Sequence, residues 1–289
     1  MQDHTLSLSS FVGQALGVPL GAIPLSSCHI RKPYLLEKQG IDSQGTAILF
    51  AVPYVMARDV SDPERNLSLY AVPRDYHRYF EDLAADLIPR LKVAFPPYRF
   101  ALFADHSPID EVDAAARCGL GVIGDNGLLL TAQFGSFVFI GEIVTNMPYE
   151  IVTDHPRSLI AVEPPRCEGC GACISACPEK CLPNQKEQCL SALTQKKGDL
   201  SERELVALSN HSLVWGCDIC QMVCPHNQEV MERGRDTPVD YFRHERLLYL
   251  NRQALDEMDD QAFRTRAYAW RGKSTIRRNL TLWEERRKK

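Results

Sequence analysis

The feature that most constrains the fold of this chain is a run of four closely spaced cysteines. Cys167, Cys170, Cys173 and Cys177 follow the spacing C-x2-C-x2-C-x3-C, and Pro178 comes directly after the last of them. This is the spacing of bacterial ferredoxins, in which three thiolates bind one 4Fe–4S cube and the fourth binds a second cube. Two residues between ligands let one tight turn direct two thiolates at neighbouring irons. The glycines of the run let backbone N–H groups face the cluster sulfurs.

A second run further along the chain repeats the last part of this pattern. Cys217, Cys220 and Cys224 have the same x2 and x3 spacings and are followed by Pro225, but the leading cysteine is missing. Cys189, which stands alone between the two runs, can supply the missing ligand from a distance. By the crossing arrangement of ferredoxins, we predict one cluster bound by Cys167, Cys170, Cys173 and Cys224, and another bound by Cys177, Cys189, Cys217 and Cys220.

Two other uses of these cysteines compete with this interpretation. C-x2-C is also the spacing of structural zinc sites, but two endings of the form C-x3-C-P fit zinc poorly. A disulfide framework is less favoured, because nothing in the sequence marks a secreted protein. The remaining cysteines have no partner by spacing, and we expect each to be a small buried residue rather than a ligand: Cys28, Cys118 and Cys181.

The chain has the length and composition of a globular protein. Its 289 residues allow one large domain or two modest ones, and an apolar fraction of 45% is ample for a hydrophobic core. The first residues, Met1 to Thr5, show no signal peptide, and no apolar run is long enough to cross a bilayer. Because cysteines used as cluster ligands need a reducing compartment, we expect a cytoplasmic protein with no membrane partner.

Charge is distributed unevenly along the chain. The formal net charge is −4, yet residues 264–289 carry ten Lys or Arg and two acids, a local balance of +8, which leaves −12 for the rest. An acidic body with a basic end indicates contact with nucleic acid or a membrane. The basic residues stand among hydroxyls and an aromatic, which suits phosphate contacts and base stacking, although a solvated basic helix has the same composition. The candidate nucleic-acid contacts are Arg271, Lys273, Arg277 and Arg278.

The first 160 residues predict an α/β domain. Apolar and β-branched runs predict strands at 47–52, 98–104, 128–132 and 136–145. Residues 75–87 have helical periodicity, and Pro89 is expected to kink or end that helix. Beyond the cysteines, residues 241–255 and 259–268 predict two more helices.

One short segment of the first domain carries candidate chemistry. Ser107 and Pro108 predict a helix start, with the helix running to Arg117 and Gly119 placed to cap it. Asp105 would then lie just outside a helix and directly after a buried strand, where active-site side chains of α/β folds tend to sit. An aspartate in that position also serves as a plain turn former.

Taken together, these residues resemble the epoxyqueuosine reductase family. The similarity extends from about Lys32 to the C-terminus, and the order of the motifs with the split second cysteine run is its most specific part. The segments that carry it are Tyr70–His77, Asp105 with Pro108 and Glu111, Gly119–Asn126, Gly135–Glu142, both cysteine runs, Cys189–Ser191, Gly216–Gln221, and Ser274 with Arg277, Arg278 and Asn279.

The resemblance implies cofactors and a reaction. Members of the family use cobalamin and two 4Fe–4S clusters to reduce epoxyqueuosine, at the wobble position of tRNA, to queuosine. The resemblance also implies that Asp105 protonates the oxygen that leaves the epoxide, which favours the catalytic interpretation over the turn interpretation. The cofactor-binding residues that it implies are Asp105, Ser191, Cys217 and Asp218.

The resemblance also implies a domain organisation. We expect an α/β cobalamin-binding catalytic domain in residues 1–160, a ferredoxin-like double-cluster domain in residues 161–232, and a basic helical segment in residues 233–289 that contacts tRNA. The expected partners are tRNA carrying epoxyqueuosine and an electron donor of unknown identity, and the expected state is a monomer.

Three departures from the family pattern keep other functions open. Asp125 stands where the family usually has lysine in a Gly-x-x-Gly-Lys-Asn turn, and the region before Lys32 matches poorly. The chain also lacks the helical-repeat extension of longer members. The alternatives are a related corrinoid-dependent reductase of another substrate, or a non-catalytic ferredoxin-like protein for electron transfer or corrinoid binding.

Overall fold

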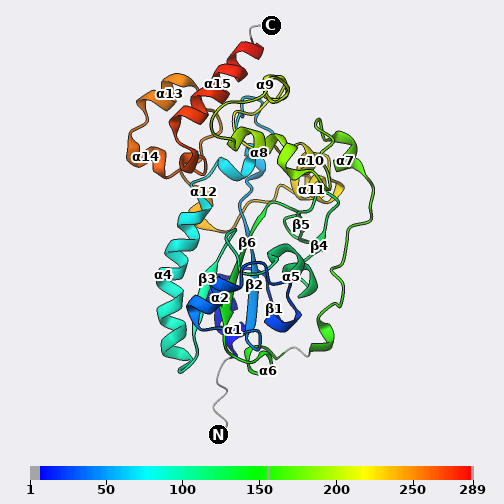
Figure 1. Cartoon of the computed structure of the whole chain (residues 1–289), viewed down its shortest axis with the longest axis vertical. Coiled ribbons are helices and arrows are strands. Elements are labelled where there is room, and N and C mark those ends of the chain that lie inside the picture. Colours follow the sequence, from blue (N-terminus) through cyan, green and yellow to red (C-terminus); the bar gives the residue numbers. More distant parts are fainter. Residues whose placement is uncertain (1–6, 155–156, 288–289) are drawn as a thin grey trace. The chain divides into compact units, whose positions relative to one another are not determined.

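The protein is described by a computed structural model, which covers residues 7–154 and 157–287 and divides the chain into two compact units (Figure 1). Unit 1 comprises residues 1–52, 77–132 and 138–168, and unit 2 comprises residues 53–76, 133–137 and 169–289. The chain therefore passes between the units several times, whereas three contiguous domains with boundaries at 160 and 232 were expected. Met1 to Thr5, on which the expected absence of a signal peptide depended, lie outside the described residues.

Unit 1 is built on a four-stranded sheet with the strand order β1-β2-β6-β3. The strands are β1 Leu20–Pro24, β2 Thr46–Pro53, β3 Phe100–Phe103 and β6 Val138–Thr145. β1 pairs antiparallel with β2, and β3 pairs antiparallel with β6, with Phe103 opposite Glu142. A separate antiparallel pair consists of β4 Val122–Ile123 and β5 Leu129–Leu130. The mixed α/β character is confirmed, as are three of the predicted strands, but the strand predicted at 128–132 contracts to two residues.

Helices cover both faces of this sheet. All residues of β2 are buried, and its alternate side chains point to opposite faces. On one face, Ala47 and Leu49 share a core with the alanines of α5 (Glu111–Arg117). On the other face, the ring of Phe50 lies 6.1 Å from that of Phe80 on α4 (Tyr76–Ala94). Burial on both faces explains why β2 is a continuous apolar run rather than an alternating pattern.

The two helices predicted for unit 1 are confirmed, but their ends differ from the predicted ones. α4 does not end at Pro89 but continues through it to Ala94. The remaining helices of the unit are α1 Leu8–Leu16, α2 Pro33–Gln39, α6 Tyr149–Val152, and the 3-10 turns η1 Leu25–Ser27 and η3 Arg157–Leu159.

α5 begins later than the sequence predicted. Its N-cap is Asp110 rather than Ser107, and the Asp110 carboxylate accepts the backbone N–H of Asp113 at 3.3 Å. The hydroxyl of Ser107 is used inside the unit instead, so the Ser-Pro pattern was wrong as a helix start. Gly119 follows the helix with a φ of 90°, as a terminating glycine does.

Unit 2 consists mainly of short helices. In its described residues they are α3 Ala57–Val60, η2 Leu69–Ala71, α7 Ala172–Ala176, η4 Lys186–Gln188, α8 Leu190–Gln195, α9 Glu202–Ser209, α10 Ile219–Met222, α11 Pro225–Glu232, α12 Asp240–Arg243, α13 Arg252–Glu257, α14 Asp260–Arg264, η5 Ala269–Arg271 and α15 Lys273–Arg287. The single helix predicted at 241–255 was wrong, because α12 and α13 are separated by extended chain. No helix among the described residues is long and apolar enough to span a bilayer.

The basic end of the chain is part of the core of unit 2. Ile276, Leu280 and Trp283 of α15 are buried in one cluster with Trp215 and Tyr268, whose rings lie 6.1 Å apart. The expectation of a separate basic segment therefore needs correction: α15 presents its charges from a helix that the fold requires. Lys288 and Lys289, which contributed to the charge balance, lie outside the described residues.

The packing between β6, β2 and α4 gives a direct test of unit 1. A Cβ added at Gly141 would lie 2.4 Å from Cζ of Phe50 and 2.5 Å from Cε1 of Phe80, both buried. We expect Gly141→Ala to destabilise the protein by about 1–3 kcal/mol, because the rings have no room to move. Gly13→Ala is the matched control: within α1 its Cβ meets only Leu20 at 3.4 Å, and we expect a gain of about 0.5–1 kcal/mol. Chemical denaturation measures both, and a Gly141→Ala protein as stable as the parent would contradict the packing.

Candidate functional site

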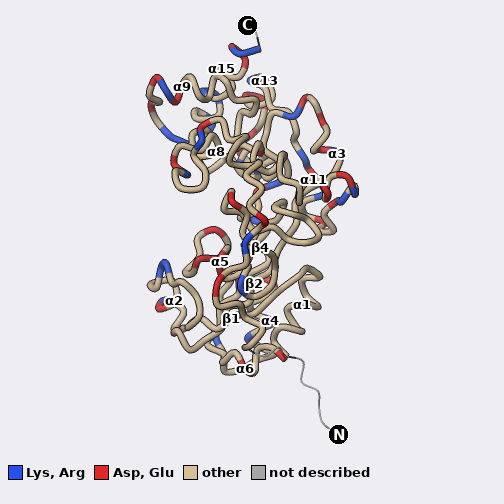
Figure 2. The backbone as a smooth tube through the Cα atoms, turned by 90° about the vertical axis from the view of Figure 1, so that its right-hand side faces the viewer, with Lys and Arg blue, Asp and Glu red and all other residues tan. Residues whose placement is uncertain are grey.

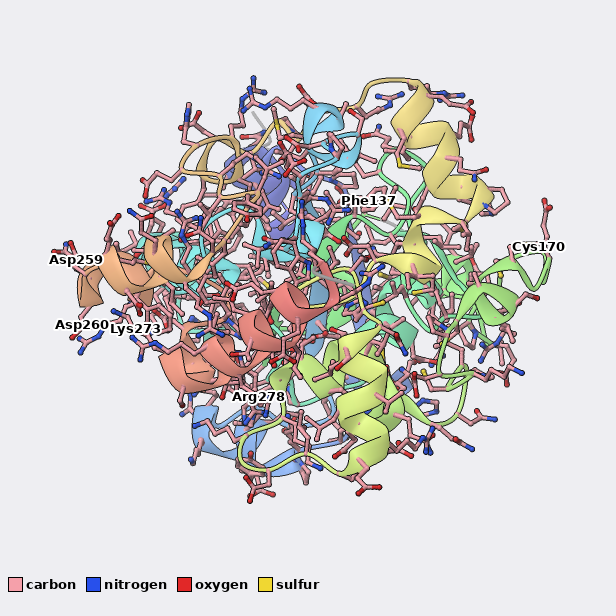
Figure 3. The ribbon with its side chains drawn as sticks, turned by 90° about the horizontal axis from the view of Figure 1, so that it is seen from above. Phe137, Cys170, Asp259, Asp260, Lys273 and Arg278 are labelled. Carbon is pink, nitrogen blue, oxygen red and sulfur yellow. The ribbon has the colours of Figure 1, made fainter. Side chains whose placement is uncertain are left out.

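The first cysteine run is shaped by glycines with left-handed backbone. Gly169 and Gly171 have φ values of 69° and 71°, a conformation that glycine adopts without strain. Gly171 is the N-cap of α7, which buries Cys173, whereas Cys170 is exposed and lies at the outer edge of unit 2 in Figure 3. Cys167 belongs to unit 1, where its backbone N–H donates to a carbonyl of β4 at 3.0 Å. The sharp turns are those that closely spaced cluster ligands need.

A group of thiols links the end of the first run to the isolated cysteine. The Sγ atoms of Cys177 and Cys181 lie 3.4 Å apart, and Cys181 is only 1% exposed. Cys189, the N-cap of α8, is close enough to interact electrostatically with both Cys181 and Cys217. Three predicted ligands of the second cluster therefore lie near one another. Cys181 is buried as expected, but it has a sulfur neighbour that its spacing in the sequence did not reveal.

The predicted donors are all thiols, which is the ligand type that iron–sulfur cubes require. Within residues 7–154 and 157–287, no three His, Cys, Asp or Glu side chains converge on a single point as the ligands of one metal ion would. A cube instead spreads four thiolates over four irons. The neighbouring sulfurs of Cys177, Cys181, Cys189 and Cys217 suit that arrangement.

The loop that carries Cys217 is held by a buried ion pair. The Asp218 carboxylate accepts a hydrogen bond from Nη1 of Arg65 at 2.6 Å and one from the backbone N–H of Leu69 at 3.0 Å. It also accepts a hydrogen bond from the hydroxyl of Ser68. The side chains of Arg65 and Asp218 are 9% and 3% exposed. The carboxylate of the predicted cofactor residue Asp218 is therefore occupied by its own chain.

A second polar network holds the helices of the second cysteine run. The Asn227 amide accepts the backbone N–H of Ser136 at 2.8 Å and donates to the Ser136 hydroxyl and the Gln221 carbonyl, each at 2.8 Å. Gln221 donates to the carbonyl and hydroxyl of Ser136 at 3.0 Å. Gly135 must be glycine, because its φ is 52° and a Cβ would lie 2.0 Å from Oδ1 of Asn227. These side chains orient Cys220 and Cys224 through their immediate neighbours.

Asp105 lies two residues after β3 in unit 1. Its φ is 65°, a left-handed conformation that few non-glycine residues adopt and that is common at functional sites. Its backbone N–H donates to Oε2 of Glu111 at 3.3 Å. Its carboxylate lies 3.5 Å from Nε2 of His77, and its side chain is 63% exposed. The sequence thus correctly placed Asp105 after a strand, and the structure adds His77 and Glu111 as its neighbours.

His106, the residue next to Asp105, has different partners. Its Nδ1 lies 3.2 Å from the ammonium of Lys32, and its Nε2 lies 3.1 Å from the hydroxyl of Tyr34. A lysine ammonium can only donate, so Nδ1 accepts and the proton of the neutral ring sits on Nε2. His106 is therefore turned towards α2, and His77 is the histidine that faces Asp105.

The predicted nucleic-acid residues mostly have acidic or carbonyl partners. Arg277 pairs with Asp256 at 2.5 Å, and Lys273 lies 3.6 Å from Asp260, beside it at one edge of unit 2 in Figure 3. Arg278 donates to the carbonyls of residues 196 and 198. The guanidinium of Arg271 stacks at 3.6 Å on the exposed ring of Trp270. Figure 2 shows the same interleaving of basic and acidic positions along this part of the chain.

The last predicted cofactor residue, Ser191, lies in the first turn of α8. Its side chain is partly buried, and its hydroxyl accepts a hydrogen bond from Nε2 of Gln195 at 3.4 Å. Ser191 and Asp218 both belong to unit 2, whereas Asp105 belongs to unit 1. The predicted cofactor residues are thus divided between the two units, and each has contacts within its own unit.

Comparison with known proteins adds a family model and named relatives. Residues 166–227 match the 4Fe-4S double cluster binding domain. The epoxyqueuosine reductase of Listeria monocytogenes is 34% identical over 219 residues, which are 72% of this chain and 54% of the relative. That of Gloeobacter violaceus is 30% identical over 239 residues, which are 81% of this chain and 71% of the relative. The chain thus spans a little over half the length of some curated relatives.

Solved structures share the fold. The epoxyqueuosine reductase of Streptococcus thermophilus superposes with a TM-score of 0.73 at 22% identity, over 97% of this chain and 81% of the other. An epoxyqueuosine reductase with an epoxyqueuosine-modified tRNA stem loop gives a TM-score of 0.70 at 21% identity, over 95% of this chain and 79% of the other.

The two cysteines between the runs, Cys181 and Cys189, give a matched test of the ligand prediction. We expect anaerobically purified protein to contain about eight irons, and Cys189→Ala to lose roughly four of them, because one cube loses a thiolate. Cys181→Ala should keep all of them, because Cys181 is predicted to pack beside the ligands without binding iron. Iron and sulfide analysis with electron paramagnetic resonance measures both variants. Loss of iron from Cys181→Ala, or stoichiometric zinc in the parent protein, would contradict the assignment.

Proposed function

Because the chain belongs to the epoxyqueuosine reductase family, we propose that it reduces epoxyqueuosine in tRNA to queuosine with two 4Fe–4S clusters and cobalamin. The observation that carries the proposal is Asp105, a strained acid at the end of a strand, in a chain that also contains a double-cluster domain. Relatives that act on tRNA and a reducing cluster chemistry agree with the expected cytoplasmic location.

The clusters would be bound as the spacing predicts, and the corrin beside the second of them. The chain's own contribution there is the loop of Cys217 and Asp218, fixed by Arg65, together with the hydroxyl of Ser191. Bound cobalamin would supply the strongly reducing cobalt centre that acts on the epoxide, recharged by electrons from the clusters. The expected external electron donor is a low-potential one-electron carrier.

Converting the epoxide to an alkene consumes two electrons and two protons and releases the epoxide oxygen as water. The protein must therefore deliver protons to an oxygen that becomes strongly basic as its C–O bond breaks. We assign the first delivery to the carboxyl of Asp105. His77, 3.5 Å from that carboxylate, would hold it in position and stabilise the anion after the proton has left.

The substrate partner is proposed to be a tRNA anticodon arm. A related enzyme of the same fold has been solved with a modified tRNA stem loop. In this chain, the exposed ring of Trp270 stacks on the guanidinium of the partly buried Arg271, and Arg277 is 54% exposed. Aromatic and guanidinium planes stack on unpaired bases, and guanidiniums bind phosphate oxygens, so these residues suit a single-stranded loop.

Replacing the acid tests the chemical role of Asp105. Asp105→Asn keeps the shape of the side chain and removes its proton, so we expect single-turnover epoxide reduction to slow by roughly a hundred- to ten-thousand-fold. Cluster and cobalamin spectra should be unchanged, because the defect lies in the transition state. His106→Ala is the control from the same loop, and it should be mild because His106 is bonded to Lys32 and Tyr34. Near-normal turnover by Asp105→Asn would return Asp105 to the role of a turn residue.

Point substitutions test the tRNA surface better than truncation, since deleting the end would remove Ile276, Leu280 and Trp283 from the core. We expect Arg271→Gln and Arg277→Gln each to weaken tRNA binding and to lower the slope of log affinity against log salt by about 1. Arg90→Gln on α4 is the control, because Arg90 is also exposed and also paired with an acid. Binding titrations over a salt series measure these slopes. If Arg271→Gln and Arg277→Gln have the same slope as Arg90→Gln, tRNA binds at another surface.

A further inference from the structure

Glu142 is a buried acid directly behind the Asp105 loop. It lies on β6 opposite Phe103, the last residue of β3, and it is completely inaccessible to solvent. Its Oε1 is 2.8 Å from the hydroxyl of Ser107, and its Oε2 has no hydrogen-bond partner in the described part of the chain. The mechanism above assigns it no role. A buried charge with one unpartnered oxygen would be costly, so its protonation state needs an explanation.

The hydrogen bonds of Ser107 show which state fits. Its oxygen accepts the backbone N–H of Ile109 at 3.0 Å, and it lies 2.9 Å from the Ile109 carbonyl as well as 2.8 Å from Glu142. A hydroxyl has one proton, so it cannot donate to the carbonyl and to a carboxylate at once. If Glu142 is neutral, it donates to Ser107, and Ser107 donates to the carbonyl of Ile109. All three contacts are then proper hydrogen bonds.

The surroundings of Glu142 favour the same state. Burial, above all, raises the pKa of Glu142 to about 8, the hydrogen bond from Ser107 lowers it, and the negative charge of Glu111 raises it. Burial likewise raises the pKa of Glu111 to about 7, and the charge of Asp105 adds to that rise. Two further charged groups, Asp110 and Lys32, lie beside Glu111. Cys28 lies beside Glu142. The groups around Cys28 are Arg117, Cys118 and Asp113.

We propose that Glu142 is a positioning residue that works as a neutral acid: it donates a hydrogen bond to Ser107 and so fixes the loop that presents Asp105. Ser107 lies two residues after Asp105, and its bonds to Ile109 close the turn between β3 and α5. Glu111 holds the other side of the same turn by accepting the N–H of Asp105. When Glu142 loses its proton, Ser107 must turn its hydroxyl away from Ile109, and the turn loses a bond.

The first test needs no substrate and no assumption about the reaction. Infrared difference spectra of the full-length, cluster-loaded protein between pH 6 and 9 should contain a buried carboxylic acid band that Glu142→Gln removes. Glu37→Gln, at an exposed position of unit 1, should leave the band in place. The apparent melting temperature should also respond. A raised pKa in the folded state means that stability is lost as pH rises from about 4.5 to 8, and Glu142→Gln should lose less of it than the parent.

The second test uses turnover and rests on the proposed function. Glutamine can donate to Ser107 but cannot lose a proton, so Glu142→Gln should keep turnover near that of the parent at pH 7 and should retain it above pH 8, where the parent declines. Glu142→Leu and Ser107→Ala remove the bond, and each should lower turnover about tenfold or more at every pH, with cluster content unchanged. A residue with only a structural role would not shift the alkaline limb of the pH profile.

The outcomes separate the two proposals. If Glu142→Gln removes no part of the acid band, or if the melting curves of parent and variant stay parallel across pH, no neutral Glu142 is present and the inference is overturned. A Glu142→Gln protein that folds, retains its clusters and loses turnover at all pH values would overturn it too, since the charge or the proton itself would then be needed. If the band behaves as expected and no epoxyqueuosine is reduced even by the parent, the proposed function fails while neutral Glu142 stands.

Discussion

The buried ion pair between Arg65 and Asp218 supports the part of the chain on which the cluster chemistry depends. Asp218 follows the predicted ligand Cys217 directly, and its carboxylate is used entirely by Arg65, Ser68 and Leu69. Removing one partner from such a pair typically costs about 3–5 kcal/mol, because the other charge stays buried. The loop is therefore held in one conformation by the protein alone, so a cluster would find its ligands already directed rather than having to order them.

Polar contacts orient the end of the second cysteine run, whereas Cys217 and Ile219 at its start also pack against an apolar cluster. Apolar burial favours compactness but not direction, whereas a hydrogen bond fixes both distance and angle. Asn227, Gln221 and Ser136 form a closed set of such bonds, and Gly135 is the residue that lets the chain approach Asn227 closely enough to make them. The apolar core of α15 with Trp215 is a separate part of unit 2.

The sequence predicted well what depends on local pattern, and poorly what depends on distant contacts. The double-cluster domain, the buried strand β2 and the place of Asp105 after a strand all follow from spacing or periodicity. Ser107 looked like a helix cap because Ser-Pro is a common start, yet its hydroxyl is used by Glu142, 35 residues away. The basic end looked like an appendage because its charges are visible in the sequence, whereas the burial of Ile276 and Trp283 depends on partners far along the chain.

Two acids, Glu142 on β6 and Asp105 in the turn after β3, show how one turn can support two different tasks. Phe103 and Glu142 face each other across β3 and β6, so the register of the sheet places Glu142 beneath the turn that begins two residues before Asp105. A reacting acid must reach its substrate, which requires an exposed side chain and a backbone rigid enough to aim it. The turn is short, so the side chains buried under it must hold it rigid. An ionised side chain in that position would cost free energy of desolvation, whereas a neutral one that is hydrogen-bonded would not. The turn thus leaves Asp105 exposed while Glu142 is buried on β6, and burial itself selects the neutral form that Ser107 requires.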